Sequence, residues 1–341
     1  MPQVPIDVSV AVINFNGAGT LEKTLDAVFV LKHIKLAKVM LVDNNSTDSS
    51  VELVKRKYPK VVIEQLAENR GPNPARNVGL RKAGSDYVLI MDNDIVVTPE
   101  YVARLMEVFL NNAKAGAASG QIRFFDDPTV VQYNGIDIHY VGEAIARPLD
   151  AVGTVKVACV SAGAVLMDRS KATRVGGFDD DFFFGWEDGD MTYRLSMAGH
   201  QCFMASEAIA YHISTPRDMK WVRYQTRNRW WFIFKNYELR TIVLALPAIA
   251  FFQACAGFFL LFKGQFGAFL AGTLDALKSI PGIREKRKAA QGIRVVPDRL
   301  LLRGDRLSLP GALGRSVFGK LVGAILGLMF RLYWAVIGVF L

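Results

Sequence analysis

Residues 8–48 read VSVAVINFNGAGTLEKTLDAVFVLKHIKLAKVMLVDNNSTD. This stretch holds an apolar, β-branched run at 8–14, a helical pattern at 20–30 and a second apolar run at 39–43. Strands that are apolar along their whole length, with helices between them, are typical of a parallel sheet that helices cover on both faces. We therefore expect an α/β fold that is Rossmann-like, with a mostly parallel sheet flanked by helices.

The same alternation continues to residue 124, and an irregular stretch around residues 133–148 separates it from one more strand. We expect helices at 46–57, 73–83 and 100–110, and strands at 61–66, 87–91, 117–124 and 155–167. Polar clusters follow four successive strands, and they begin at Asn14, Asp43, Glu68 and Asp92. One such cluster would mean little, because asparagine and aspartate are ordinary turn and N-cap residues. Since the carboxyl ends of parallel strands carry functional loops, the four together predict a shared site.

Charge is distributed unevenly along the 341 residues. The chain has 41 lysines and arginines and 32 aspartates and glutamates, a net charge of +9, and residues 213–341 hold 20 of the basic but only 6 of the acidic residues. Long apolar runs separate these basic residues, which favours lipid headgroups over nucleic acid as their partner. We expect a catalytic domain at 1–214 and a basic, apolar, helical membrane-associated region at 215–341.

The cysteines and the first residues indicate the compartment of the catalytic part. Cys159, Cys202 and Cys255 are widely spaced and odd in number, which argues against a disulfide framework and suits a reducing compartment. The opening MPQVPIDVSV lacks the basic start of a secretory signal. We expect the catalytic part to lie in the cytoplasm.

The sequence DND at 92–94 is a candidate metal site. Asp92 and Asp94 follow a strand and stand two residues apart, so both carboxylates can lean toward one cation. Hard oxygen ligands suit Mg²⁺ or Mn²⁺ bridging a diphosphate. The plain alternative is a turn followed by an aspartate N-cap.

Residues 176–190 read GGFDDDFFFGWEDGD and crowd carboxylates among aromatic rings. The helix dipole accounts for one or two acidic residues at a helix start. It does not account for so many, and apolar surroundings would raise their pKa values. A raised pKa suits a general base that takes a hydroxyl proton near neutral pH.

Residues 68–79 read ENRGPNPARNVG. Glycine allows close backbone approach, and Arg76 offers a planar donor fork to phosphate or ribose oxygens. The stretch lacks the Walker spacing, and no GxGxxG follows the first strand. These absences argue against P-loop, kinase-like and dinucleotide-binding sites.

Together these motifs resemble family 2 of the inverting glycosyltransferases, which have the GT-A fold. The resemblance runs through most of residues 6–236 and is carried by these segments in order: VSVAVINFNG, LVDNNSTD, NRGPNPARNVG, LIMDNDI, VSAGAVLMDRS, GGFDDDFFFGWEDGDMTYRLSMAGH and the AYH that ends at His212. Within the family, the chain looks most like bacterial enzymes that extend lipid-linked polysaccharides, including rhamnosyl- and galactofuranosyltransferases.

The resemblance implies a role for each residue that matches a family motif. Asp188 would be the base that activates the acceptor hydroxyl, with Glu187 beside it and Trp186 forming an acceptor wall. A UDP- or dTDP-sugar donor would contact Asn14, Asp43 (at the pyrimidine base), Arg76, Asn77 and Asp92. The divalent cation, Mg²⁺ or Mn²⁺, would be bound by Asp92, Asp94 and His212.

The implied reaction is a single displacement that inverts the anomeric centre. It would move a hexosyl or deoxyhexosyl group to a polyprenyl-diphosphate-linked glycan in cell-surface polysaccharide synthesis. A polyprenyl-phosphate glycosyltransferase is an alternative, although such enzymes typically have a DAD-type motif and this chain has DND. A nucleotidyltransferase would need a basic, glycine-rich loop where the chain has VINFNGAGT. A non-catalytic membrane scaffold would leave Asp94, Asp188 and His212 unexplained.

The second half contains two long apolar segments. Residues 241–262 are 22 residues without a charge, about 33 Å as a helix, which is long enough to span a bilayer. Basic residues on both flanks favour a helix lying in the cytoplasmic leaflet over a spanning one. In the predicted last helix, 317–341, glycines at every fourth position could pack against another helix, as in a homodimer. Arg227 and Arg229 could bind the acceptor's lipid diphosphate or be solvated helix charge.

Overall fold

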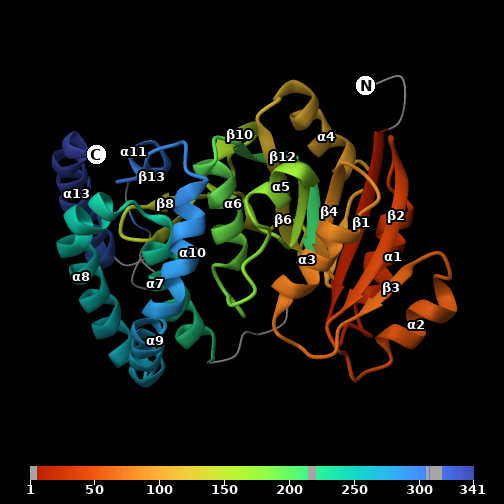
Figure 1. Cartoon of the computed structure of the whole chain (residues 1–341), viewed down its shortest axis with the longest axis horizontal. Helices are drawn as coiled ribbons and strands as arrows, with labels where there is room; N and C mark the ends of the chain where they lie inside the picture. The colour runs from red at the N-terminus through yellow and green to blue at the C-terminus, as the bar shows by residue number, and fades with distance from the viewer. Residues whose placement is uncertain (1–5, 214–219, 305–306, 308–316) are drawn as a thin grey trace. The chain divides into compact units, whose positions relative to one another are not determined.

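The computed structural model describes the chain except for residues 1–5, 214–219, 305–306 and 308–316 (Figure 1). Two compact units are interleaved along the sequence. The first unit comprises Met1–Gly135, Pro148–Leu195 and His200–Pro216, and the second comprises Ile136–Arg147, Ser196–Gly199 and Arg217–Leu341. We keep the domain boundary near residue 214 as a prediction and describe each unit by itself.

Four parallel strands form one half of the sheet in the first unit, in the order β4-β1-β2-β3. They are β1 (Ile6–Asn14), β2 (Ile34–Asp43), β3 (Val62–Gln65) and β4 (Tyr87–Asp92), connected by α1 (Leu21–Phe29), α2 (Ser50–Lys57) and α3 (Pro72–Lys82). Residues 8–14 of β1 are all buried, because helices cover the sheet on both of its faces. The register places Asn14 beside Asp43 and Ile13 beside Asp92, so the strand ends meet at one edge.

The other half of the sheet is mixed. Strand β11 (Ala164–Asp168) runs antiparallel between β4 and β6 (Ala115–Phe124), and β12 (Gln201–His212) runs parallel to β6. The remaining elements of this half are β5 (Ile95–Val97), β7 (Val131–Tyr133), β10 (Thr154–Val157), α4 (Tyr101–Asn111), α5 (Arg169–Arg174) and α6 (Glu187–Met197). The predicted α/β fold is thus confirmed, with the parallel strands gathered around β1.

Residues 155–167, predicted as one strand, form two strands joined by an irregular segment. The N–H of Ser161 donates to Tyr133 Oη (2.9 Å), and the N–H of Ala162 donates to Asp188 Oδ2 (3.2 Å). Because side chains bind these N–H groups, the segment leaves the strand ladder. It runs instead along the edge where the polar residues gather.

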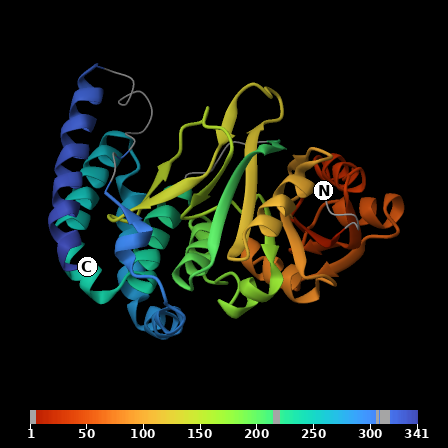
Figure 2. The same cartoon turned by 90° about the horizontal axis from the view of Figure 1, so that it is seen from above.

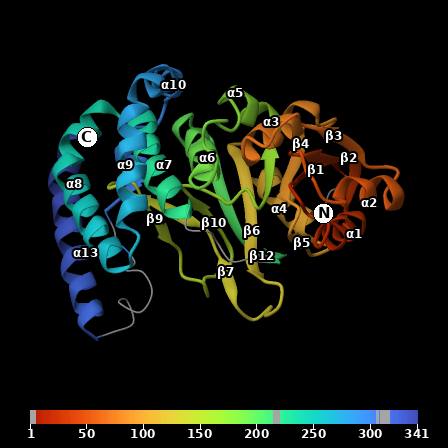
Figure 3. The same cartoon turned by 90° about the horizontal axis from the view of Figure 1, so that it is seen from below.

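The second unit is mostly helical. It contains α7 (Lys220–Asn236), α8 (Leu239–Phe262), α9 (Phe266–Lys278), α10 (Ile280–Gly292), α11 (Asp298–Leu301), α13 (Val317–Ile337), the 3-10 helix η1 (Gly338–Phe340) and a small sheet of β8 (Ile136–His139), β9 (Glu143–Ala146) and β13 (Leu302–Arg303). Figures 2 and 3 show α8 and α13 side by side. Two segments, Leu239–Phe262 and Leu321–Phe340, are long and apolar enough to cross a membrane by length and composition alone.

Candidate active site

A buried polar network joins the ends of β1 and β2. Asn14 Nδ2 donates to Asp43 Oδ1 (2.7 Å) and to Ser50 Oγ (2.9 Å), and Ser46 Oγ donates to Asp43 Oδ1 (2.6 Å). Asn14 and Asp43 have no exposed surface. Their observed role is therefore to hold the 43–50 turn in place, and the contact of either residue with a nucleotide stays a prediction.

Arg76 is the central cation of the candidate site. It lies on α3, is 3% exposed, and donates through Nη2 to both oxygens of Asp92 (3.1 and 3.3 Å). Its Nη1 lies 3.7 Å from Glu187 Oε1. Burial alone would lower the pKa of Arg76, but the carboxylates of Asp92, Glu187 and Asp188 outweigh burial and raise it. The guanidinium thus compensates a cluster of negative charge.

Burial shifts two of these carboxyl groups toward neutral pH. It raises the pKa of Glu187 to about 7, with Asp188 adding to the rise and Arg76 opposing it. It raises the pKa of Asp92 to about 6, where Arg76 opposes the rise and both Asp94 and Asp188 add to it. Asp94 and Asp188 therefore each lie within electrostatic reach of Asp92.

Asp94 and His212 meet because β5 pairs with the end of β12, with Ile95 opposite His212. His212 Nε2 lies 3.3 Å from Asp94 Oδ2, and His212 Nδ1 lies 2.8 Å from Gln132 Oε1. In the neutral tautomer with its proton on Nδ1, His212 donates to Gln132 Oε1, and Nε2 presents its lone pair toward the carboxylate. A cation between two such acceptors would satisfy both, and an oriented second nitrogen is typical of histidine ligands.

In the described parts of the chain, no three or more His, Cys, Asp or Glu side chains form a group that could hold a metal ion. Asp94 and His212 therefore supply a pair of donors rather than a cage. Mg²⁺ in proteins commonly takes one or two carboxylates and completes its shell with substrate phosphates and water. The pair fits a cation of that kind.

Backbone N–H groups orient Asp188. Ala162 N donates to Asp188 Oδ2 (3.2 Å) and Gly189 N donates to Asp188 Oδ1 (2.7 Å). The adjoining Gly163 carbonyl accepts from Asp92 N (3.0 Å). One short segment, 162–163, thus ties the carboxylate at the start of α6 to the end of β4.

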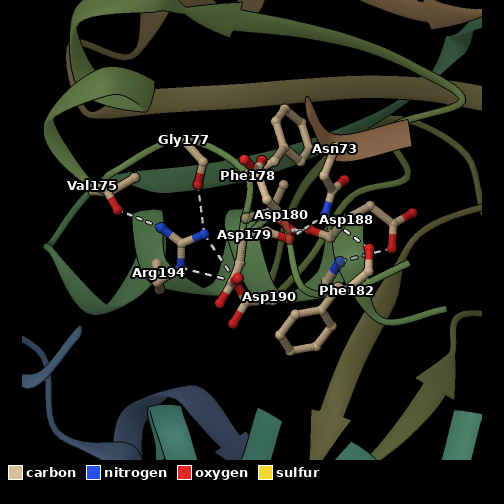
Figure 4. Close-up of polar contacts among 12 residues, drawn as sticks. Asn73, Val175, Gly177, Phe178, Asp179, Asp180, Phe182, Asp188, Asp190 and Arg194 are labelled. Atoms are coloured by element: carbon tan, nitrogen blue, oxygen red, sulfur yellow. Dashed lines mark hydrogen bonds and ion pairs between the residues drawn. The ribbon is translucent and has the colours of Figure 1, made fainter. Parts of the chain in front are cut away.

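The acidic and aromatic loop before α6 is fixed from two sides (Figure 4). From α3, Asn73 Nδ2 donates to Asp179 O (2.7 Å), and Asn77 Nδ2 donates to Phe178 O and Asp180 Oδ1 (both 2.8 Å). From α6, the buried Arg194 donates to the carbonyls of Val175 and Gly177 and to Asp190. These contacts place Asn77 against the loop, and its predicted contact with the donor stays a prediction.

Trp186 occupies an unusual backbone conformation just before Glu187. Its φ is +67°, a value that is uncommon for bulky residues and clusters at functional sites. The N–H of Asp190 donates to the Trp186 carbonyl (2.8 Å), which starts α6. A Cβ on Gly189 would lie 3.5 Å from the indole, so the ring lies over this glycine. The neighbouring Phe183 and Phe184 are 37% and 39% exposed.

Arg227 and Arg229 belong to α7 in the second unit. Arg229 is 5% exposed and donates to Gln253 Oε1 (2.7 Å) and Val141 O (2.6 Å). The Arg227 guanidinium lies over the Trp231 ring, 4.0 Å from its centroid. Both arginines thus have contacts inside their own unit, and their binding of an acceptor stays a prediction.

Sequence reasoning missed four residues that shape this site: Asn73, Gln132, Tyr133 and Arg194. Two of them left a signal in the sequence. Asn73 and Asn77 stand four apart on one face of α3, as do Asp190 and Arg194 on α6. Gln132 and Tyr133 left none, because only the pairing of β7 with β6 brings them to the site.

Comparisons with known proteins identify the domain. Residues 9–174 match the model of the family described as Glycosyl transferase family 2. Poly-beta-1,6-N-acetyl-D-glucosamine synthase of Staphylococcus aureus is 27% identical over 190 residues, 55% of this chain and 45% of that protein. The succinoglycan biosynthesis protein ExoO of Rhizobium meliloti is 30% identical over 139 residues, 40% of this chain and 38% of that protein. The chain thus matches less than half the length of these relatives.

Solved structures confirm the fold. GalNAc-T7 with UDP, GalNAc and Mn²⁺ aligns with a TM-score of 0.58 and 16% identity, covering 73% of this chain and 52% of that one. The mannosyltransferase PcManGT of Pyrobaculum calidifontis, in complex with GDP-Man and Mn²⁺, aligns with a TM-score of 0.53 and 17% identity, covering 99% and 88%. Residues 9–174 thus resemble family 2 glycosyltransferases, and the fold is of the GT-A type, as the motifs predicted.

Proposed function

We propose that this protein is an inverting glycosyltransferase of cell-surface polysaccharide synthesis. It would move a hexosyl or deoxyhexosyl group from a nucleotide sugar to a polyprenyl-diphosphate-linked glycan. The observation that carries the proposal is the meeting of the Asp94–His212 pair with Asp92, Arg76 and Asp188 at the strand ends of a family 2 domain. That arrangement offers a cation site and an oriented carboxylate together.

The donor end of the reaction is assigned to the residues around Asp92. Arg76 Nε and Glu187 Oε2 are buried and have no hydrogen-bond partner among the described residues. Unsatisfied buried polar atoms beside a charged cluster support a missing polar ligand. A UDP- or dTDP-sugar would supply hydroxyl and phosphate groups there, in keeping with the nucleotides in the solved neighbours.

Asp94 and His212 would hold Mg²⁺ or Mn²⁺. Asp92, which lies within electrostatic reach of Asp94, would add its negative charge beside the cation. When bound, the cation would neutralise the charge that develops on the departing nucleoside diphosphate. The solved neighbours that contain Mn²⁺ support this assignment. Arg76 Nη2 donates to both carboxylate oxygens of Asp92. This contact favours the charged form of Asp92 and orients its carboxylate.

Asp188 would act as the general base. Its carboxylate would accept the proton of the acceptor hydroxyl as the new C–O bond forms and the bond from sugar to phosphate breaks. The N–H groups of Ala162 and Gly189 fix the orientation of this carboxylate. Attack from the face opposite the diphosphate inverts the anomeric centre.

The acceptor would be presented at the cytoplasmic face of the cell membrane. The partly exposed Trp186, Phe183 and Phe184 offer apolar surface next to Asp188, suited to the faces of sugar rings. Arg227, on the basic second unit, remains our candidate for the acceptor's diphosphate.

A binding and transfer experiment tests the proposal. UDP or dTDP, added with Mn²⁺ or Mg²⁺, is expected to raise the melting temperature, because a ligand that binds only the folded form stabilises it. Radiolabelled sugar should then move into a lipid extract that contains polyprenyl-diphosphate-linked glycan. If no nucleotide stabilises the protein with either cation and no label reaches the lipid, the proposal is wrong.

A further inference from the structure

Helices α8 and α13 of the second unit each bury one face and expose an apolar one. On α8, Val243, Leu246 and Phe258 are 61%, 50% and 65% exposed, and on α13, Ile325, Leu332 and Val336 are 59%, 58% and 62% exposed. We call these six residues and their helix faces the apolar surface. Composition alone would allow either helix to cross a bilayer.

The two helices pack against each other in antiparallel directions. Tyr333 Oη donates to the carbonyl of Leu244 (2.8 Å), and the rings of Phe251 and Phe330 lie 6.2 Å apart. Figure 3 shows the two helices as neighbours over much of their length. The exposed faces of α8 and α13 are therefore neighbouring parts of the second unit.

The chain on both sides of α8 contacts the same helix, α7. Helix α7 directly precedes α8, and after α8 the chain returns along α9, where Asp275 pairs with Arg223 of α7 (2.6 Å). Helix α10 then reaches the other end of α7, because Arg287 donates to the carbonyls of Phe234 (2.7 Å) and Tyr237 (2.6 Å). Helix α7, which precedes α8, and helices α9 and α10, which follow it, therefore pack together on one side of α8.

The middle of α8 is also bound to α7. Arg229 Nη1 donates to Gln253 Oε1 (2.7 Å), and Gln253 Nε2 donates to Thr273 Oγ1 of α9 (3.1 Å). If α8 crossed a bilayer, this contact would carry the Arg229 charge to the depth of the hydrocarbon. Charged side chains at that depth are costly. The packing of α7 on α8 therefore opposes a spanning α8.

Charge indicates what covers the apolar surface. Residues 217–341 contain 20 lysines and arginines against 6 aspartates and glutamates. Arg240 and Lys263 lie at the two ends of α8, and Arg284 and Lys288 lie on α10, all four exposed. Apolar helix faces among exposed cations match a leaflet of anionic lipid, whose headgroups pair with cations and whose chains take up the apolar side chains.

We propose that the second unit binds one leaflet of an anionic bilayer through the apolar surface, and that the chain crosses the bilayer at neither α8 nor α13. The first unit and the segment after α8 then face the same compartment. The inference does not depend on the sugar-transfer activity. Its tests measure labelling and vesicle binding, so they can fail independently of the proposed function.

A thiol-labelling experiment tests the topology. The native exposed thiol is removed by Cys255→Ala, because Cys159 and Cys202 are buried. Gly84→Cys then reports the first unit and Gly282→Cys reports the chain after α8, and an added Cβ at either position meets no atom within 4 Å. A cysteine appended after Leu341 reports the far end of α13.

We expect a membrane-impermeant maleimide to label all three cysteines in inverted membrane vesicles and none in intact spheroplasts. Labelling of Gly282→Cys in spheroplasts, with Gly84→Cys protected, would show that α8 spans. Labelling of the appended cysteine alone in spheroplasts would show the same for α13. Either result overturns the proposal.

A flotation experiment tests the surface. The full chain should float with vesicles of phosphatidylcholine and phosphatidylglycerol, and the double variant Phe258→Glu, Leu332→Glu should bind at least about tenfold more weakly. Val152→Glu is the matched control, since Val152 is an exposed apolar residue of the first unit, 84% exposed. Unchanged flotation of the double variant would overturn the proposal. So would a vesicle-free dimer that the double variant dissociates, because a second copy would then cover the surface.

Discussion

At the residue scale, the Arg76 guanidinium allows several carboxylates to lie close together at the ends of the strands. It is nearly fully buried and contacts Asp92 and Glu187 at once. Carboxylates brought out of water without such a cation would repel one another and become protonated. Burial still leaves Glu187 with a pKa of about 7, so this carboxyl group changes its protonation near neutral pH.

Replacing Asp188 separates catalysis from binding. We expect Asp188→Asn to lower turnover by roughly 10²–10⁴, the usual loss for a positioned base, because the amide cannot take the acceptor's proton. The asparagine keeps the size of the side chain and can still accept one of the two hydrogen bonds from Ala162 N and Gly189 N through its Oδ1. Nucleotide binding should therefore persist, as measured by calorimetry with UDP or dTDP and Mn²⁺. Near-normal turnover of the variant would remove Asp188 from the role of base.

Glu187 gives the stability of the protein a definite dependence on pH. Burial raises its pKa from 4.5 in the unfolded chain to about 7 in the folded protein. The folded state therefore binds more protons between these values, and its free energy of unfolding falls as the pH rises through this window. In urea unfolding from about pH 5 to pH 8, we expect Glu187→Gln to remove up to roughly 3 kcal/mol of this fall.

The comparison uses the slope with pH, since differences between glutamine and protonated glutamate that do not involve ionisation shift the variant's stability equally at every pH. Glu52→Gln, on the exposed side of α2, serves as the control and should follow the natural protein. A Glu187→Gln protein that loses stability as steeply as the natural one would contradict the assignment.

At the element scale, α3 acts as the support of the loop that leads to Glu187 and Asp188. Asn73 and Asn77, one turn apart, bind loop carbonyls at 178, 179 and 182. Gly71, at the start of α3 with φ of +90°, lies so close that a Cβ would be 2.7 Å from the Phe183 carbonyl. Loop and helix thus fit backbone to backbone, and the carboxylates of α6 depend on that fit.

We expect the double variant Asn73→Ala, Asn77→Ala to lower kcat about 10- to 100-fold through misplacement of the loop. Limited proteolysis should cut residues 178–186 faster, because the loop loses its anchors to α3. The control is Asn112→Ala at the end of α4, where the side chain bonds only the Val108 carbonyl of its own helix among the described contacts. If KM for the donor rises while kcat and proteolysis stay unchanged, Asn77 contacts the donor instead.

Local pattern predicted every element of the parallel half of the sheet, because β1, β4 and the second half of β2 are apolar and bounded by turn residues. It missed residues 34–38 of β2, where lysines alternate with apolar side chains. It predicted residues 155–167 as one strand because nothing local shows that Tyr133 and Asp188 take its N–H groups. The same limit applies to the site. Asp92, Asp94 and Asp188 stand in recognisable motifs, whereas Gln132 reaches His212 only through strand pairing across 80 residues of sequence.

At the scale of the whole molecule, the candidate site and the excess of basic residues lie in different parts of the sequence. Carboxylates and amides of the first unit make the candidate site, whereas residues 213–341 carry 20 basic residues against 6 acidic ones and residues 1–212 are net negative. In the proposed function, the basic, apolar unit would keep the protein near anionic lipid, where a lipid-linked acceptor would be concentrated in two dimensions. The match to the family model concerns the first unit alone, since the matching residues end at 174.

Charge and apolar burial should contribute separately to membrane binding. Salt screens the attraction of lysine and arginine for anionic headgroups but leaves the burial of apolar side chains intact. We therefore expect flotation with phosphatidylglycerol-containing vesicles to weaken about tenfold between about 50 mM and about 500 mM NaCl. With vesicles of pure phosphatidylcholine we expect weaker flotation that does not change with salt.

The double variant Arg284→Glu, Lys288→Glu should lose the preference for anionic vesicles at low salt, because both side chains are exposed on α10. The matched control is Lys55→Glu, Arg56→Glu on α2 of the first unit, which makes the same change in net charge. Equal losses in the two double variants would show that net charge, rather than the placement of cations around the apolar surface, attracts the protein to the bilayer.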